Sequence, residues 1–132
     1  MWTLPLADFF NAHASAEAAT LEALIREEAD VVTCGVIASE VLQGIRRTAT
    51  LPAIEEAFRD MEWLTPMEPQ TYLQAAALFR GLRARGRTVR STIDCLIARL
   101  AEENDVLLLH KDRDLALILE SGLVSVKALP LV

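Results

Sequence analysis

Four carboxylates stand where a small protein with alternating strands and helices can bring them together: Glu40, Asp94, Asp112 and Asp114. Asp94 lies three residues after Ser91, in the segment 90–98. Ser91 is a good helix N-cap because its hydroxyl can accept a hydrogen bond from a free backbone N–H of the first turn. Asp94 then takes the acidic position of a capping box, where the helix dipole favours an anion. The simplest interpretation of Asp94 is therefore a cap, and the other acids decide whether it is more.

Converging carboxylates predict a cation. Two unit charges about 5 Å apart repel by roughly 3 kcal/mol at an effective dielectric constant of about 20. A fold keeps such a cluster when a counter-charge offsets the repulsion, and Mg²⁺ and Mn²⁺ prefer oxygen ligands with several waters retained. Carboxylate-held metal with water is a common arrangement for phosphodiester hydrolysis. The alternative is four unrelated acids among nineteen, with Asp112 or Asp114 only capping the last helix.

The elements that must position these acids follow from apolar periodicity. Short apolar or β-branched runs predict strands ending near Leu4 and at 31–34, 61–64, 106–109 and 124–126. Amphipathic spacing predicts helices over 16–28, 36–47, 51–60, 69–83, from Ser91 onward, and over 112–120. Gly86 is expected to end the helix over 69–83. Strands that alternate with helices predict a single α/β domain over residues 1–132 with a mainly parallel sheet of four to five strands.

Such a sheet places the acids on one rim. In open α/β sheets the site lies beyond the carboxyl ends of the strands. Asp112 and Asp114 follow the strand 106–109 within a few residues, and Glu40 lies one turn into the helix after 31–34. Asp94 begins a further helix, so the four acids come from three separate segments and are expected at the same edge.

Three finer expectations concern burial. The helix over 69–83 is expected to be buried through Tyr72, Ala75, Ala76, Phe79 and Leu82. The acids Glu102, Glu103 and Asp105 are expected to form a solvated helix end. The apolar residues Phe9, Phe10, Trp63 and Leu64 are expected mainly in the core, with a dimer or partner surface as the alternative.

Composition limits the class of protein. The 132 residues are 52% hydrophobic with only five Gly and five Pro, which argues against disorder. No apolar run reaches the length of a membrane span, and the first residues carry no basic region of a signal peptide. Cys34 and Cys95 lie in apolar surroundings and are expected to be reduced, buried thiols of a cytoplasmic protein.

The net charge of the chain does not exclude a nucleic-acid substrate. The net charge of −6 argues against a general polyanion binder, although a local basic patch and metal ions can reverse the field at a site. Five arginines fall within eleven residues, close to Asp94: Arg80, Arg83, Arg85, Arg87 and Arg90. They can pair with phosphates, and the alternative is favourable charge at a helix C-terminus followed by a solvated loop.

Three segments carry a family resemblance. The run 90–98 with Asp94, the run His110-Lys111-Asp112-Arg113-Asp114, and the run Ser39-Glu40-Val41-Leu42-Gln43-Gly44 together resemble a PIN-domain ribonuclease of the VapC toxin type. The resemblance covers essentially the whole chain. It implies a three-layer α/β/α sandwich, Mg²⁺ or Mn²⁺ at the acidic cluster, endonucleolytic cleavage of RNA, a homodimer, and inhibition by an antitoxin protein.

The resemblance also assigns residues. It implies Glu40, Asp94 and Asp112 as catalytic acids and metal ligands, with Asp114 as a further ligand. Arg87, Arg90 and Ser91 are the residues expected to contact RNA.

The chain departs from the family at its first acid, which closes the first strand. Counting back from Asp8-Phe9 places Trp2 there, 38 residues before Glu40, whereas Asp8 itself stands 32 residues before Glu40. The family spacing is nearer the first value. Two alternatives therefore accompany the nuclease: a catalytically degenerate PIN-domain protein that acts as a binding partner, and, less favoured, a receiver-like domain with an acidic Mg²⁺ site.

Overall fold

The structure is a computed structural model that describes residues 2–3, 31–46, 48–110 and 113–130. The described helices are α3 (Gly35–Gln43), α4 (Leu51–Asp60), α5 (Gln70–Ala84), α6 (Thr92–Asn104) and α7 (Arg113–Glu120), with a 3₁₀ turn η1 at Thr48–Thr50. The described strands are β1 (Trp2–Thr3), β2 (Val32–Cys34), β3 (Glu62–Leu64), β4 (Leu107–His110) and β5 (Ala128–Pro130). The predicted helix over 16–28 and the segment around Asp8 lie outside these ranges.

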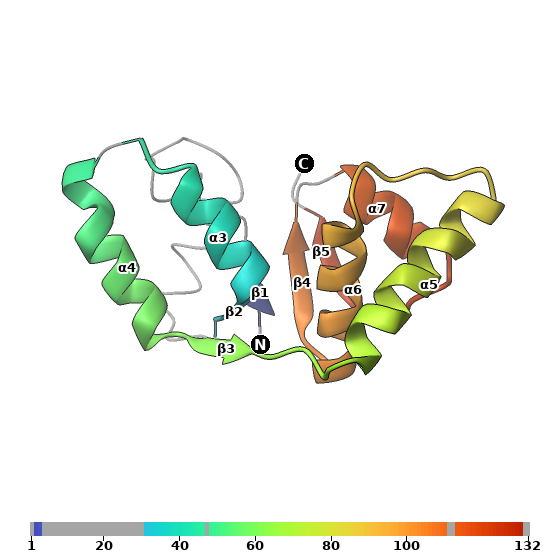
Figure 1. The fold of residues 1–132 in the computed structure, drawn as a ribbon, viewed down its shortest axis with the longest axis horizontal. Helices are drawn as coiled ribbons and strands as arrows, with labels where there is room; N and C mark the ends of the chain where they lie inside the picture. Colours follow the sequence, from blue (N-terminus) through green and yellow to red (C-terminus); the bar gives the residue numbers. More distant parts are fainter. Residues whose placement is uncertain (1, 4–30, 47, 111–112, 131–132) are drawn as a thin grey trace.

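All strand pairs in the described part of the chain are parallel. The strands β1, β4 and β5 form a sheet in the order β1-β4-β5, and β2 pairs with β3 in a second, two-stranded sheet. In Figure 1 these strands lie between α3 and α4 on one side and α5, α6 and α7 on the other. The α/β class and the parallel pairing are confirmed. The five described strands form a three-stranded and a two-stranded sheet rather than the expected single sheet of four to five strands.

Helix α6 is the element on which the C-terminal half packs. It contacts α5, α7 and β4, and five of its residues are buried: Cys95, Ile97, Ala98, Leu100 and Ala101. The neighbouring elements bury Leu78 and Leu82 of α5, Leu108 of β4 and Ile118 of α7. Since α6 carries Asp94 at its start, the residue is attached to the most buried helix of the described fold.

Two element boundaries differ from the prediction by more than one residue. Helix α3 ends at Gln43 rather than at 47, because Gly44 follows, the residue type with the lowest helix propensity after proline. The last strand begins at Ala128 rather than at 124. The backbone N–H of Ser125 instead donates to the Glu102 carboxylate at 2.6 Å, so this backbone group is engaged outside a sheet.

The buried face of α5 also differs from the prediction. Tyr72, expected to be buried, is 46% exposed. The buried residues are Thr71, Ala75, Leu78 and Leu82, which share one helical face. The prediction is right for Ala75 and Leu82, and it missed Leu78 and Thr71, a polar residue that is completely buried.

The turn after α5 directs the chain toward the start of α6. The N–H of Gly86 donates to the carbonyl of Arg83 at 3.0 Å, and the N–H of Arg87 donates to the carbonyl of Leu82 at 2.9 Å. This is a Schellman motif, which requires a left-handed residue, and Gly86 has φ of +73°. The prediction that Gly86 ends the helix is confirmed.

Candidate active site

The start of α6 is built as its sequence predicts. Ser91 has extended backbone angles, and its Oγ accepts a hydrogen bond from the backbone N–H of Ile93 at 3.0 Å. Asp94 is the third residue of the helix and lies partly exposed. Its carboxylate therefore stands in the first turn, where the helix dipole favours the anion, with a side that solvent and a ligand can reach.

Asp114 is held by Arg90. It lies in the first turn of α7 and is one of four buried polar residues found in the described ranges. Its Oδ2 accepts hydrogen bonds from the backbone N–H and from the Nε of Arg90, both at 3.0 Å. The Asp114 side chain is 9% exposed and the Arg90 side chain 82% exposed. These two hydrogen bonds lower the pKa of Asp114 below its usual value, so its buried carboxyl stays ionised.

Glu40 lies on the solvent side of α3. The neighbouring residues Ala38 and Val41 are buried, whereas Glu40 is exposed. Its negative charge is one of the causes that raise the pKa of the Cys34 thiol, after burial, which is the largest. Because Cys34 is the last residue of β2, Glu40 lies near the carboxyl end of that strand, as expected from the topology.

Asp112 lies outside the described residues, between His110 at the end of β4 and Arg113 at the start of α7. Among the residues that the structure does describe, no three His, Cys, Asp or Glu side chains lie close enough to hold a metal ion together. Glu40, Asp94 and Asp114 are carboxylates, the donor type that Mg²⁺ and Mn²⁺ prefer. These three acids come from three helices, and Asp114 is already paired with Arg90.

The arginines divide between the two expected roles. Arg85 donates from Nη1 to the carbonyl of Ser121 at 2.7 Å, and the Arg83 guanidinium lies 6.0 Å from the centre of the Phe79 ring. Arg90 pairs with Asp114. Arg80 and Arg87 have exposed side chains. Part of the arginine segment therefore stabilises the fold, and Arg80 and Arg87 present their charge to solvent.

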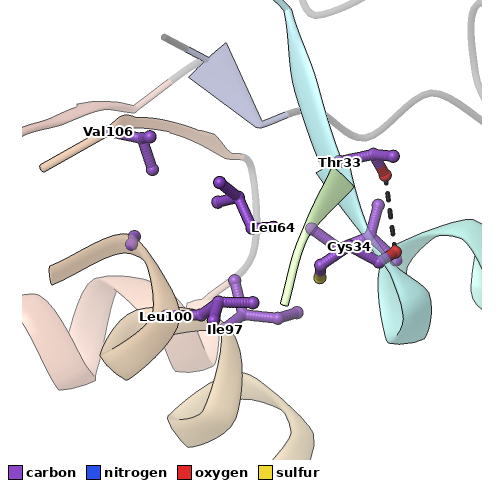
Figure 2. A pocket seen from close by; sticks show the side chains of 8 residues that line it. Thr33, Cys34, Leu64, Ile97, Leu100 and Val106 are labelled. Carbon is purple, nitrogen blue, oxygen red and sulfur yellow. Dashed lines mark hydrogen bonds between the residues drawn. The ribbon is translucent and has the colours of Figure 1, made fainter. Parts of the chain in front are cut away.

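A small hydrophobic pocket lies between the strands and α6. Figure 2 shows Thr33, Cys34 and Leu64 facing Ile97, Leu100 and Val106. The Thr33 hydroxyl donates to the carbonyl of Cys34 at 3.5 Å. None of the described residues that line this pocket carries a carboxylate or a basic group. Its lining suits packing of β2 and β3 against α6, and it contributes no group to the acid set.

The pairing of Arg90 with Asp114 is the feature of this site that sequence reasoning missed. The two residues are 24 positions apart, and no periodic spacing links them. The topology predicts that both segments meet at one edge of the sheet. The expectation drawn from it concerned the acids alone and did not include Arg90. The same convergence brings Arg90, directly before Ser91, next to an acid of α7.

The fold and the acidic residues at its edge define the class: the chain belongs to the PIN domain family, whose model matches residues 6–118. Two curated relatives are Ribonuclease VapC11 of Mycobacterium tuberculosis and VapC ribonuclease Mb1587 of Mycobacterium bovis. Each is 33% identical over 112 residues, which is 84% of this chain and 84% of the relative.

Two solved structures share the fold. One is VapBC2 from Rickettsia felis bound to a DNA fragment from its promoter, with a TM-score of 0.66 and 14% identity over 98% of this chain and 97% of that chain. The other is FitAcB from Neisseria gonorrhoeae, with a TM-score of 0.65 and 15% identity over 97% of this chain and 96% of that chain. At these identities the likeness concerns the fold alone.

Proposed function

We propose that this protein is a metal-dependent endoribonuclease and the toxin of a toxin–antitoxin pair. Two curated relatives named as VapC ribonucleases support the ribonuclease part, each at 33% identity over 84% of the chain. The observation that carries the proposal within this chain is Asp94, held partly exposed in the first turn of α6 by the Ser91 cap. A carboxylate in this place suits a hard cation, and the helix dipole favours its anionic form.

The proposed catalytic acids are Glu40, Asp94 and Asp112. All are oxygen donors, so in chemistry they fit Mg²⁺ or Mn²⁺. When bound, such an ion supplies positive charge at a phosphate oxygen and lowers the pKa of a water. The chain's own part is to hold Asp94 on a rigid helix and to present Glu40 on the solvent side of α3.

The proposed RNA contacts come from the segment before α6. Arg87 and Arg90 have exposed side chains within seven residues of Asp94, and Ser91 lies between them and the acid. An arginine that contacts a phosphate loses less on desolvation than an ammonium does and offers parallel N–H donors. These side chains would orient the backbone of an RNA strand relative to Asp94, and the affinity would fall with rising salt.

The proposed partners are an antitoxin protein and a second copy of this chain, in the cytoplasm. The solved structures of VapBC2 and FitAcB support an antitoxin partner, because each name denotes a complex of two different proteins. None of the described helices is both long and apolar enough to cross a membrane. A cationic antitoxin side chain that reaches Asp94 or Glu40 would compete with the metal ion for the carboxylates, which is a physical route to inhibition.

The test of the nuclease is cleavage of a mixed RNA by the purified chain with Mg²⁺ or Mn²⁺. Wild-type protein should cleave, excess chelator should stop it, and Asp94→Asn should lose at least a factor of about 100, the range expected when a group that stabilises transition-state charge is removed. Asp60→Asn, on the far end of α4, is the matched control and should cleave like the wild type. Equal cleavage by Asp94→Asn would reject this site.

A second candidate is a catalytically degenerate member of the family that only binds a partner. The observation that favours it is Trp2 in β1, where the family spacing places an acid. Expression without its antitoxin separates the two candidates. Growth arrest that Asp94→Asn relieves supports the toxin. Harmless expression of a folded chain that still captures its antitoxin supports the binding partner.

A further inference from the structure

Asp114 is tied to the backbone that carries Asp94. Its Oδ2 accepts two hydrogen bonds from a single residue, Arg90, at 3.0 Å each, and one of these donors is a backbone N–H. Arg90 directly precedes Ser91, the N-cap of α6, and Asp94 follows three residues later. An acceptor that holds a backbone N–H fixes the path of the chain at that point, which a contact through a long side chain alone does not.

The burial of the two partners supports this interpretation. Asp114 is 6% exposed, and Val89, on the other side of Arg90, is 2% exposed. The Arg90 side chain is 82% exposed. The carboxylate is therefore the inner member of the pair, and its burial is offset by the two N–H groups it accepts from. A ligand of an exchangeable, hydrated cation would be expected on the solvent side instead.

We propose that Asp114 is a positioning residue for Asp94, acting through the Arg90 backbone and the Ser91 cap, and that it is not a ligand of the metal ion. The proposal rests on the proposed function for the role of Asp94. Helix α7 would then fix the position of the backbone at which α6 begins, through the Asp114 carboxylate. The acids that hold the cation would be Glu40, Asp94 and Asp112.

The first test is backbone hydrogen exchange measured by NMR, which needs neither metal nor RNA. In Asp114→Ala the N–H groups of Arg90 and Ile93 should exchange at least about tenfold faster than in the wild type, because an open backbone donor loses its protection. In Asp114→Asn the amide oxygen can still accept from the backbone N–H, and the exchange should stay closer to that of the wild type. Unchanged exchange in Asp114→Ala overturns the proposal.

The second test is calorimetric titration of Mn²⁺ into four folded proteins: the wild type, Asp94→Asn, Asp114→Ala, and the double variant Arg90→Gln with Asp114→Asn. The double variant keeps the net charge of the wild type and keeps an oxygen for the backbone N–H of residue 90. It should bind Mn²⁺ within about threefold of the wild type, whereas Asp94→Asn should lose at least about tenfold, since it removes a ligand. Asp114→Ala should bind more weakly than the double variant, because it displaces Asp94.

The Mn²⁺ titrations distinguish a positioning role of Asp114 from a role as a metal ligand, and both from a failure of the proposed metal dependence. A double variant that binds Mn²⁺ as weakly as Asp94→Asn makes Asp114 a ligand and overturns the positioning role. If wild-type protein binds no Mn²⁺, the metal dependence of the proposed function fails. The positioning role is then decided by the exchange at Arg90 and Ile93 alone.

Discussion

The buried hydroxyl of Thr71 lies 2.9 Å from each carboxylate oxygen of Glu103, and it donates to that carboxylate from 32 residues away in the chain. The same Oγ1 accepts the backbone N–H of Met67 at 2.8 Å. Glu102, beside Glu103, accepts from Arg99 at 2.9 Å and from the N–H of Ser125. The end of α6 thus joins the start of α5 to the segment before β5. The expectation that Glu102 and Glu103 only form a solvated helix end was wrong.

Removing the Thr71 hydroxyl should destabilise the fold. Thr71→Val keeps the shape of the side chain but leaves the Met67 N–H and the Glu103 carboxylate without this partner. A lost buried hydrogen-bond partner costs about 1–3 kcal/mol. Urea denaturation should show that loss, and Thr71→Ser, which keeps the hydroxyl, should recover most of it. Equal stability of the Val variant and the wild type would contradict the role given to Thr71.

Metal binding should stabilise the folded protein through Asp94. A ligand that binds only the folded state adds about 2.7 kcal/mol when present at about 100 times its Kd. Mn²⁺ should therefore raise the Tm of the wild type by several degrees and raise that of Asp94→Asn far less. Ca²⁺ at the same concentration controls for a general effect of divalent ions. An equal rise of Tm in both proteins would place the ion elsewhere.

The two thiols should be unreactive in the folded protein. Cys95 is completely buried, and burial together with the negative charge of Asp94 raises its pKa from 9.0 to about 11. Cys34 is also buried, and burial raises its pKa. A thiol reagent at a pH of about 8 should label neither residue until urea unfolds the chain, because the thiolate is the nucleophile. Rapid labelling of Cys95 in native protein would contradict its burial against the core.

The raised pKa of Cys95 also predicts that the folded protein loses stability at alkaline pH. The unfolded thiol ionises near 9.0 and the folded thiol near 11. The contribution to stability is complete below pH 9.0 and is lost as the pH rises toward 11, because the unfolded state releases its proton first. Cys95→Ala should remove this part of the alkaline loss, as measured by urea denaturation on either side of this window.

Gly86 should resist substitution for a conformational reason. Its φ is +73°, and a Cβ there would meet no atom within 4 Å, so the strain of the left-handed backbone is the relevant term. That strain costs about 1–2 kcal/mol for a residue with a side chain. Gly35, at the start of α3, also has open space and is the matched control, since its φ lies outside the left-handed region. Gly86→Ala should lower the free energy of unfolding, and Gly35→Ala should not.

Much of the site could be predicted because its signals are local. Ser91 as a cap, Asp94 in the first turn and Gly86 as a helix end each depend on residues within one turn, and the structure confirms all three. Long-range pairs leave no such signal. The contact of Arg90 with Asp114 and that of Thr71 with Glu103 join residues 24 and 32 positions apart, and neither follows from hydropathy or spacing.

The last prediction concerns the first acid. Family spacing places it at Trp2, but β1 pairs with β4 in a register that sets Trp2 level with Leu107, the first residue of β4. The strand then continues for three residues to His110, which is about 10 Å at 3.3 Å per residue. An acid at position 2 would therefore lie at the start of β4, whereas Asp112 follows its end.

We therefore expect Trp2→Asp to leave RNA cleavage with Mn²⁺ within about threefold of the wild type, because a carboxylate so far from the rim adds no ligand to the metal ion. Asp94→Asn in the Trp2→Asp background controls for a contaminating nuclease. Asp8→Asn is the companion variant, since Asp8 is the alternative first acid, and it lies outside the described residues. If Trp2→Asp instead cleaves ten or more times faster than the chain as it stands, position 2 reaches the site and the family spacing is the better guide than the strand register.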